Sequence, residues 1–284
     1  MDCLIFGAYG YLGSRIYDYF NILRNKVVIG TQANFPEIHK NFKIIRNYKR
    51  LSDIQLRELI KEFDLVIDAT GISGLNILIE DKVEIIKSNT LWPCTLAKAC
   101  IETKTKLVWF STYHCENIKI DNEEKIKKGI YSLSKLLTES SIMNQSKWES
   151  FITIARLGNM IGSPGSIYSG KSNLFAFEVI RDLINYKKIT IRSNPSKQIG
   201  FVPISYLFSS PIFTRSGFYK IYNLKKNSIY AITKIIQKSY ENLSGNKTEI
   251  LFNKKVNHIK DELVSNDLKK EIELMVLYFL KETS

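Results

Sequence analysis

Several features are scarce in or missing from this chain of 284 residues. Its four cysteines, Cys3, Cys94, Cys100 and Cys115, show neither paired C-x-x-C spacing nor the density of a disulfide scaffold, so reduced thiols are expected and a metal site is not. No apolar run reaches the ~18 residues of a membrane span, and no basic stretch precedes the first apolar residues as in a secretory leader. These absences favour a globular cytoplasmic protein without a membrane span.

Acidic residues are also in the minority, because 41 Lys and Arg face 28 Asp and Glu and give a formal net charge of +13. This excess favours anionic partners, either a nucleic acid or a small ligand with phosphates. The basic residues are spread along the chain, with no long basic block and no aromatic RNA-binding stretch. We therefore expect no nucleic-acid partner and a largely solvated basic surface.

The chain begins with a short apolar run, residues 3–6, followed at once by Gly7, Gly10 and Gly13. Such a strand, glycine turn and helix is typical of dinucleotide binding: one glycine permits a tight turn, one lets the backbone approach a pyrophosphate, and one allows close helix packing. The phosphates would lie at the N-terminus of the helix that begins near Leu12 or Gly13. A glycine-rich turn without a ligand is the weaker alternative, because a strand precedes the motif and an amphipathic segment follows it.

Further apolar runs alternate with segments of helical periodicity. The strands are expected at residues 26–31, 42–45, 63–69 and 106–110, and the helices at 14–23, 51–63 and 81–100. Nearly continuous apolar strands indicate a sheet covered on both faces, so the fold class is α/β, a Rossmann-like doubly wound parallel sheet. Ser111 and Thr112 follow the fifth strand and would lie at the carboxyl edge, where such sheets bind ligands.

Tyr131 and Lys135 follow Thr112 on a helical segment and are four residues apart, so they share a helix face. A lysine ammonium beside a phenol is expected to lower the phenol pKa from ~10 and prepare it for proton transfer. The same spacing recurs at Tyr222 and Lys226 and at Tyr230 and Lys234. Only the first pair lies between the fifth and sixth strands, which favours Tyr131.

Taken in order, these motifs resemble the extended short-chain dehydrogenase/reductases, the NAD-dependent epimerase/dehydratase family, and within them the dTDP-4-dehydrorhamnose reductase branch. The resemblance covers most of residues 1–235. Besides the glycines, Tyr131 and Lys135, it rests on Asn89 and on residues 110–113, 156–159, 173–175, 198–200 and 203.

The resemblance implies that Thr112 hydrogen-bonds the reacting oxygen, Tyr131 transfers the proton, and Lys135 tunes Tyr131 and holds the nicotinamide ribose. The cofactor-binding residues it implies are Gly7, Tyr9, Gly10, Tyr11, Leu12, Gly13, Thr31, Gln32, Ala69, Thr70, Gly71, Asn89, Ser111, Tyr131, Lys135 and Leu157. Gly30, Thr31 and Gln32 include no carboxylate to bind a ribose 2′-hydroxyl or repel a 2′-phosphate, so NADP(H) is favoured and NAD(H) is the alternative.

The resemblance also assigns residues to a substrate and to a second lobe. Expected substrate contacts are Thr112, Tyr113, Asn159, Lys171, Arg192 and Lys197, the basic ones toward a diphosphate. Residues 1–160, with 200–232 returning to them, would form the NAD(P)-binding Rossmann domain, and 161–199 with 233–284 a smaller substrate-binding lobe. Residues 113–115 depart from the family pattern. Asp68 is expected to act as a hydrogen-bond acceptor in a loop, and residues 261–280 to form a helix that closes the smaller lobe or meets a partner.

From these features we expect an NAD(P)H-dependent reductase of a nucleotide-activated 4-keto-6-deoxy sugar in glycan or cell-surface polysaccharide biosynthesis. The nearest alternative is a nucleotide-sugar epimerase or dehydrogenase that uses the same Thr112, Tyr131 and Lys135. A non-catalytic NADP-binding regulatory subunit is an alternative of another class. A homodimer through residues 81–100 and 131–144 is also expected from the resemblance.

Overall fold

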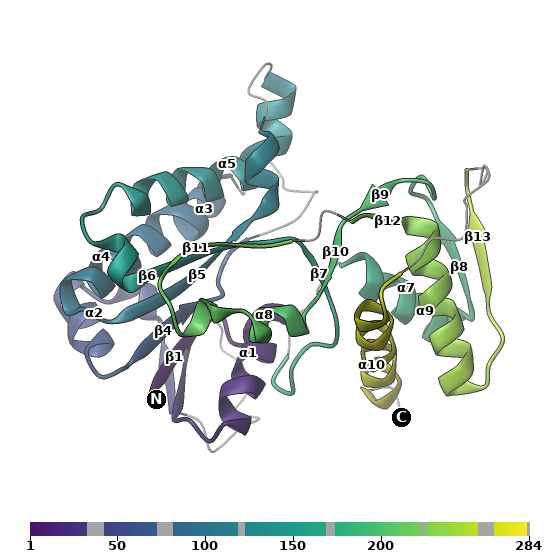
Figure 1. Ribbon diagram of the computed structural model, residues 1–284, viewed down its shortest axis with the longest axis horizontal. Coiled ribbons are helices and arrows are strands. Elements are labelled where there is room, and N and C mark those ends of the chain that lie inside the picture. Colours follow the sequence, from purple (N-terminus) through teal and green to yellow (C-terminus); the bar gives the residue numbers. More distant parts are fainter. Residues whose placement is uncertain are drawn as a thin grey trace. The chain divides into compact units, whose positions relative to one another are not determined.

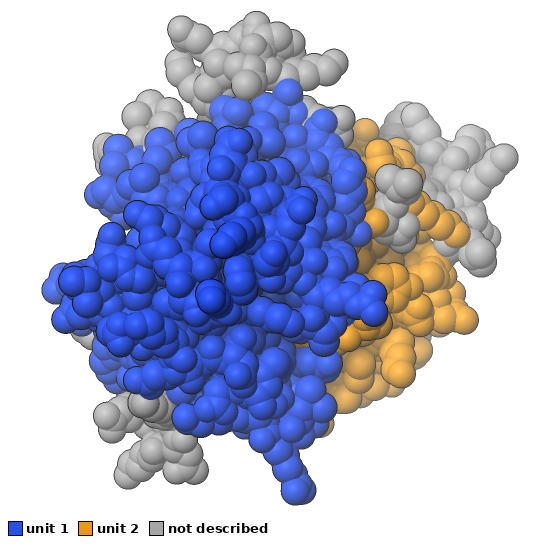
Figure 2. Space-filling model, turned by 60° about the vertical axis from the view of Figure 1, so that its left-hand side comes forward, with its two compact units in different colours: residues 1–157, 165–170, 210–220 blue, residues 158–164, 171–209, 221–284 orange. Residues whose placement is uncertain are grey.

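The computed structural model describes residues 1–32, 43–72, 82–118, 123–168, 174–222, 225–254 and 264–282. The chain separates into two compact units, coloured blue and orange in Figure 2. Unit 1 comprises residues 1–157, 165–170 and 210–220, and unit 2 comprises 158–164, 171–209 and 221–284. Compactness does not by itself define a domain, so the domain bounds expected from the sequence stay a prediction.

Unit 1 is built on a sheet of seven strands in the order β11-β6-β5-β4-β1-β2-β3. Strands β1 to β6 pair in parallel, and the order reverses on the two sides of β1, as in Rossmann folds. Their bounds are β1 Cys3–Phe6, β2 Val27–Thr31, β3 Lys43–Arg46, β4 Leu65–Asp68, β5 Lys106–Thr112, β6 Ile152–Leu157 and β11 Gly217–Ile221. The predicted fold class is confirmed, and β5 extends two residues further than predicted, to Thr112.

Helices cover one face of this sheet (Figure 1). Their buried side chains form one continuous apolar core with the sheet. The core joins Leu4, Phe6, Val66 and Trp109 of the strands to side chains of α2, α4 and α5. The helices are α1 Tyr11–Ile22, α2 Asp53–Ile60, α4 Trp92–Thr103, α5 Glu123–Met143 and the short α6 Trp148–Phe151. Helix α1 packs against β1 and β2 without joining this core, so both sheet faces are covered. Double coverage explains the unbroken apolar strands.

Local sequence signals set several helix ends. Helix α2 follows the 3-10 turn η1, Tyr48–Arg50, and begins with a capping box in which Ser52 and Gln55 satisfy each other's backbone N–H groups. Helix α4 ends where Lys104 adopts a left-handed conformation. The predicted helix 81–100 is not one regular helix: α3 Lys82–Ile86 runs into a π-helical segment, η3 Lys87–Leu91, before α4. Pro93, in the first turn of α4, has no N–H to continue the α-helical ladder, which accounts for the interruption.

Unit 2 contains three small strand pairs and a group of helices. Strand β7 Asn159–Ile161 pairs with β10 Phe201–Pro203, β9 Gln198–Ile199 with β12 Asn227–Ser228, and β8 Lys188–Ile191 with β13 Glu249–Phe252. The helices are α7 Phe175–Tyr186, α8 Ser205–Ser209, α9 Ile229–Ser244 and α10 Asn266–Glu282. The 3-10 turn η5, Pro211–Phe213, returns to unit 1.

Helix α10 packs against α9, α7 and β10, so it closes unit 2 as predicted. Ile272, Met275, Val276 and Phe279 are buried, whereas Leu274 is exposed. Most of the apolar run is therefore used in the core of unit 2, which argues against the alternative of a broad partner surface on this helix.

We expect Gly13→Ala to lower the free energy of unfolding by roughly 1–3 kcal/mol, the usual cost of forcing an extra group into a packed site. A Cβ at this position would lie 2.1 Å from the backbone oxygen of Gly7. Gly129→Ala is the matched control, because a Cβ at this α5 position meets nothing within 4 Å and should stabilise the helix by about 0.5–1 kcal/mol. Urea unfolding of both variants checks the prediction, and a neutral Gly13→Ala variant would contradict it.

Candidate active site

The glycine turn lies at the centre of the sheet, between the carboxyl ends of β1 and β4. Gly7 has a positive φ of 78°, and a Cβ there would lie 2.8 Å from the backbone of Ala69, which follows β4. Around Gly10, by contrast, a Cβ would meet only the Gly7 oxygen among the described residues, at 3.3 Å. The backbone at Gly10 is thus open to a close ligand, while Gly7 and Gly13 keep the turn compact.

Helix α1 begins at Tyr11, so Tyr11, Leu12 and Gly13 form its first turn. Its N-cap, Gly10, supplies no side-chain acceptor to the first N–H groups, and no acidic residue stands in the first turn. This leaves the positive end of the helix available to an anion. The turn and the helix end therefore fit a pyrophosphate, and Gly7, Gly10 and Gly13 are the residues that would cradle it.

At the carboxyl end of β2, Thr31 is buried and Gln32 is exposed. With its amide oriented to meet the donors around it, the Gln32 oxygen accepts from the backbone N–H groups of Tyr48 and Lys49, at 3.0 Å each. Arg46 ends β3 as the register partner of Thr31. Burial raises the pKa of Tyr9 in the glycine turn, and the Arg46 charge lowers it, so Arg46 and Tyr9 lie near each other.

The loop after β4 is tied to the π-helical segment η3. Asp68 accepts from the Thr70 N–H at 3.1 Å and from the Thr70 hydroxyl at 2.5 Å, the acceptor role predicted for it. Asn89 is fully buried, accepts from the Ile72 N–H at 2.8 Å and donates to the Ile72 oxygen at 3.0 Å. Its amide also donates to the Ser134 hydroxyl at 3.3 Å. Asn89 therefore links this loop to α5 beside Lys135.

Thr112 and Tyr131 are brought together by β5 and α5. The Tyr131 phenol lies near the Thr112 hydroxyl, whose interaction with the phenol lowers the phenol pKa. The Thr112 oxygen also accepts from the His114 N–H at 3.3 Å and so caps the 3-10 turn η4, Tyr113–Asn117. Leu157 is the register partner of Thr112 at the end of β6. The two hydroxyl groups are thus held at the carboxyl edge of the sheet.

Lys135 reaches the same edge from one turn further along α5 and is only 4% exposed. Its ammonium donates to the Phe110 carbonyl oxygen at 2.8 Å and lies 4.7 Å from the ring centre of Trp109. Burial lowers the pKa of Lys135 to about 8, and the nearby Asp68 carboxylate opposes this shift. Lys135 therefore titrates close to neutral pH.

The pKa of Tyr131 is shifted in the direction opposite to the one predicted. Burial raises it to about 12, a neighbouring Cys115 also raises it, and the interaction with Thr112 lowers it. The expectation that Lys135 lowers this pKa was wrong for the structure as it stands, because desolvation of the phenolate outweighs the other effects and the Lys135 ammonium is turned to Phe110 and Trp109.

Sequence reasoning missed a buried ionic group behind these residues. Glu139, 2% exposed, accepts from Arg156 Nε at 2.8 Å and from a terminal guanidinium nitrogen at 2.5 Å. The Ser111 hydroxyl also donates a hydrogen bond to Glu139. Ser111 was expected to contact the cofactor, but its hydroxyl hydrogen is used by this carboxylate. Glu139 stands four residues after Lys135, and that repeated interval is the signal that could have found it.

Tyr113, His114 and Cys115 line the turn after Thr112. The rings of Tyr113 and His114 lie 4.1 Å apart, and the Cys115 thiol is buried and donates to the Ser132 oxygen at 3.4 Å. Burial raises the pKa of Cys115, so the thiol stays protonated and is a poor nucleophile.

The remaining predicted substrate contacts belong to unit 2. Asn159 begins β7 and donates to the Gly200 oxygen at 3.5 Å, while Arg192 and Lys197 are exposed. Lys171 lies outside the described residues. Their role at the site stays a prediction.

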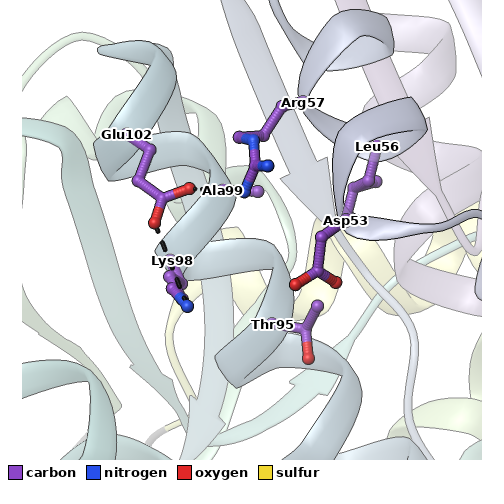
Figure 3. Close-up of a pocket in the computed structure, with 7 residues that line it drawn as sticks. All are labelled: Asp53, Leu56, Arg57, Thr95, Lys98, Ala99 and Glu102. Carbon is purple, nitrogen blue, oxygen red and sulfur yellow. Dashed lines mark hydrogen bonds and ion pairs between the residues drawn. The ribbon is translucent and has the colours of Figure 1, made fainter.

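A shallow pocket between α2 and α4 lies away from these residues (Figure 3). It is lined by Asp53, Leu56, Arg57, Thr95, Lys98, Ala99 and Glu102. Arg57 contacts Glu102 at 2.9 Å and Lys98 contacts it at 4.0 Å, so the charges pair with one another. Its volume of about 10 Å³ is the space of one water molecule, too little for a substrate.

Within the described part of the chain, no helix combines the length and apolar character needed to cross a membrane. In the same residues, no three His, Cys, Asp or Glu side chains are grouped to hold a metal ion.

The Rossmann-type sheet and the family match indicate an NAD-dependent enzyme of the extended short-chain dehydrogenase/reductase type. The chain belongs to the NAD dependent epimerase/dehydratase family, whose model matches residues 3–203. No curated protein matches its sequence.

Solved structures share the whole fold at low identity. UDP-N-acetylglucosamine 4-epimerase from Methanobrevibacter ruminantium M1, in complex with UDP-N-acetylmuramic acid, is similar with a TM-score of 0.76 and 15% identity, over 99% of this chain and 98% of that one. UDP-glucuronic acid 4-epimerase from Bacillus cereus, in complex with NAD, has a TM-score of 0.69 and 18% identity, over 99% and 97%. The NAD-dependent NDP-hexosamine 5,6-dehydratase TunA of tunicamycin biosynthesis has a TM-score of 0.71 and 13% identity, over 99% of this chain and 98% of that one. They give no support to the dTDP-4-dehydrorhamnose reductase branch.

We expect Arg156→Met to lower the free energy of unfolding by roughly 3–5 kcal/mol at neutral pH, because it leaves the Glu139 carboxylate buried without its cationic partner. Arg57→Met is the matched control: the Arg57–Glu102 pair has a similar separation but is about one third exposed, so its loss should cost at most ~1 kcal/mol. Urea unfolding of the two variants measures the difference, and equal losses would show that Glu139 is not held by Arg156.

Proposed function

We propose that this protein is an NAD(P)-dependent nucleotide-sugar epimerase whose reaction runs at Thr112, Tyr131 and Lys135. The observation that carries the proposal is that Tyr131 of α5 lies near Thr112 at the end of β5, with the buried Lys135 one turn further along α5, at the sheet edge that also holds the glycine turn. This arrangement offers a proton at one defined oxygen beside a fitting dinucleotide site.

The epimerase takes precedence over the 4-keto-6-deoxysugar reductase expected from the sequence. Similar structures include 4-epimerases of UDP-linked sugars and an NDP-hexosamine dehydratase, which favours a substrate with a nucleoside diphosphate. The same three side chains serve a reductase, because they act on the sugar oxygen whichever way the electrons move. The reductase therefore remains the second candidate.

The chain's own residues have distinct tasks in this proposal. When bound, NAD(P) supplies hydride exchange at a sugar carbon. Thr112 orients the sugar oxygen next to Tyr131. Tyr131, whose pKa is about 12, is a phenol at neutral pH and can protonate an alkoxide; to act as a base it must gain a positive neighbour. The Lys135 ammonium, one helical turn away, is the described cation best placed to turn toward it.

We expect Tyr131→Phe to lower kcat by about 10²-fold or more, because it removes the transferred proton, and to leave dinucleotide binding intact. Tyr230→Phe is the matched control: Tyr230 also stands four residues before a lysine, with the Lys234 ammonium 5.9 Å from its ring centre, but it belongs to α9 of unit 2. The assay incubates UDP-glucose, UDP-N-acetylglucosamine and UDP-glucuronic acid with NAD and, separately, with NADP, and separates the diastereomeric products.

The cofactor balance distinguishes the two candidates. An epimerase forms the new diastereomer without net NADH, whereas a reductase consumes NADPH in proportion to a 4-keto-6-deoxy sugar. If dinucleotides bind and none of these sugars reacts, the result favours the regulatory subunit considered above.

We further propose that the site prefers NADP(H). Gly30, Thr31 and Gln32 supply no carboxylate, and Arg46, exposed at the adjacent strand end near Tyr9, is a cation that can meet a 2′-phosphate.

Calorimetry should therefore show tighter binding of NADPH than of NADH to the wild type. Arg46→Ala should weaken NADPH binding by about tenfold and leave NADH binding unchanged, since one charge-assisted contact is lost. Arg50→Ala removes an exposed arginine from η1 and is the control. Tighter binding of NADH by the wild type would contradict the preference.

A homodimer is also part of the proposal. Val83, Leu91 and Leu137 are each more than half exposed on α3, η3 and α5, which pack against one another. Exposed apolar side chains on adjacent helices are typical of subunit contacts.

A further inference from the structure

Asp68 is a buried carboxylate that the proposed reaction does not use. It ends β4 and is 1% exposed. One oxygen accepts both hydrogen bonds from Thr70, whereas Oδ2 is buried and accepts no well-aligned hydrogen bond from the described residues, although the Trp92 indole interacts with the carboxylate. A nearby positive charge would stabilise the charged form of this buried carboxyl group.

The charged form of Lys135, in turn, would be stabilised by a nearby negative charge. Among the described residues, the buried Lys135 ammonium has one hydrogen-bond acceptor, the Phe110 carbonyl, and lies over the face of the Trp109 ring. Neither group carries a full negative charge, so they compensate the desolvation of the ammonium only in part.

Strand register brings the two charges to the same face of the sheet. Asp68 pairs directly with Trp109, the residue whose ring the Lys135 ammonium covers at 4.7 Å. Directly paired residues on neighbouring strands are ~4.8 Å apart and point to the same face. Three residues after Asp68, a Cβ on Gly71 would lie 3.4 Å from Lys135 Nζ, so the chain leaving β4 passes next to the ammonium.

The other charged groups around this pair are already engaged or weaker. Glu139 is paired with Arg156, and Cys115 is a protonated thiol. Around Asp68, the Lys49 ammonium donates to the Ser88 hydroxyl at 3.0 Å and belongs to an exposed residue, while Tyr48 and Cys100 are neutral. Asp68 is thus the carboxylate left for Lys135.

We propose that Asp68 is the counter-ion of Lys135 and holds its ammonium charged and in place at the active site. As a role in catalysis, this rests on the proposed function, but the pairing itself does not. Asp68 comes first among the groups that raise the pKa of Lys135 against the effect of burial, and Lys135 in turn lowers the pKa of Asp68. Removing the carboxylate should therefore lower the pKa of Lys135 further below about 8.

The test is an NMR titration of the full chain labelled with [¹³Cε]lysine, with the Lys135 signal assigned by its loss in Lys135→Met. In Asp68→Asn we expect Lys135 to titrate at a pH lower by about one unit or more. Glu84→Gln is the control, because Glu84 is a carboxylate that acts on Lys49 and not on Lys135, and its titration should match the wild type. An unchanged Lys135 titration in Asp68→Asn would overturn the proposal.

A second measurement needs only the wild type, should Asp68→Asn fail to fold. With [¹³Cγ]aspartate, the Asp68 carboxyl signal, assigned through its backbone, should shift as Lys135 loses its proton near pH 8. A signal that stays constant there would overturn the pairing. Neither titration needs substrate, so failure of the proposed reaction leaves their result intact. If the epimerase activity is found, it should fall at alkaline pH as Lys135 loses its proton. In Asp68→Asn this fall should begin at a lower pH than in the wild type.

Discussion

The buried contact between Glu139 and Arg156 fixes α5 against the sheet, and the reacting groups depend on that helix. Tyr131, Lys135 and Glu139 follow one another at intervals of four, so they lie along one face of α5. Arg156 and Ser111, the two partners of Glu139, are register partners on β6 and β5. One carboxylate therefore ties the helix to two neighbouring strands, immediately before Thr112. Two nitrogens and a hydroxyl satisfy Glu139 and offset the desolvation of a buried charge.

The ionisable groups of the site are buried, and this burial shifts the pKa of each of them. Burial raises the pKa of Tyr131 and Asp68 and lowers that of Lys135, because it disfavours the charged form in every case. Opposite charges placed near each other reduce the free-energy penalty of burying the charged groups, without exposing these groups to water. A lysine that titrates near neutral pH can respond to a small change in its surroundings, whereas an exposed lysine would stay charged. Burial destabilises the charged form of each of these groups, and it also makes the charge of Lys135 sensitive to a change in its surroundings.

Much of the fold could be predicted because its signals are local. Strands covered on both faces are apolar throughout, and the glycine turn has close steric constraints. Four-residue spacing placed Tyr131 and Lys135 on one helix face. The long-range contacts around these residues were not predictable in this way: Ser111 donates to Glu139, 28 residues away, and the register of β4 and β5 places Asp68 beside Trp109, whose ring the Lys135 ammonium covers. The direction of the Tyr131 pKa shift was missed because spacing indicates which side chains are near, not how much water reaches them.

In the proposed function, unit 1 supplies the proton donor and the dinucleotide site, but these do not by themselves separate an epimerase from a reductase. Both proposed reactions would place a sugar oxygen at Thr112 and Tyr131. They differ in whether hydride returns to the opposite face of the same sugar carbon, which requires the sugar to turn while its nucleotide stays bound. The grip on the diphosphate and the room around the sugar would decide between the two proposed reactions. The basic residues predicted to contact the diphosphate, such as Arg192 and Lys197, belong to unit 2. If the proposed roles of Thr112, Tyr131 and Lys135 hold, the choice between the two reactions rests on the substrate contacts and not on these three side chains.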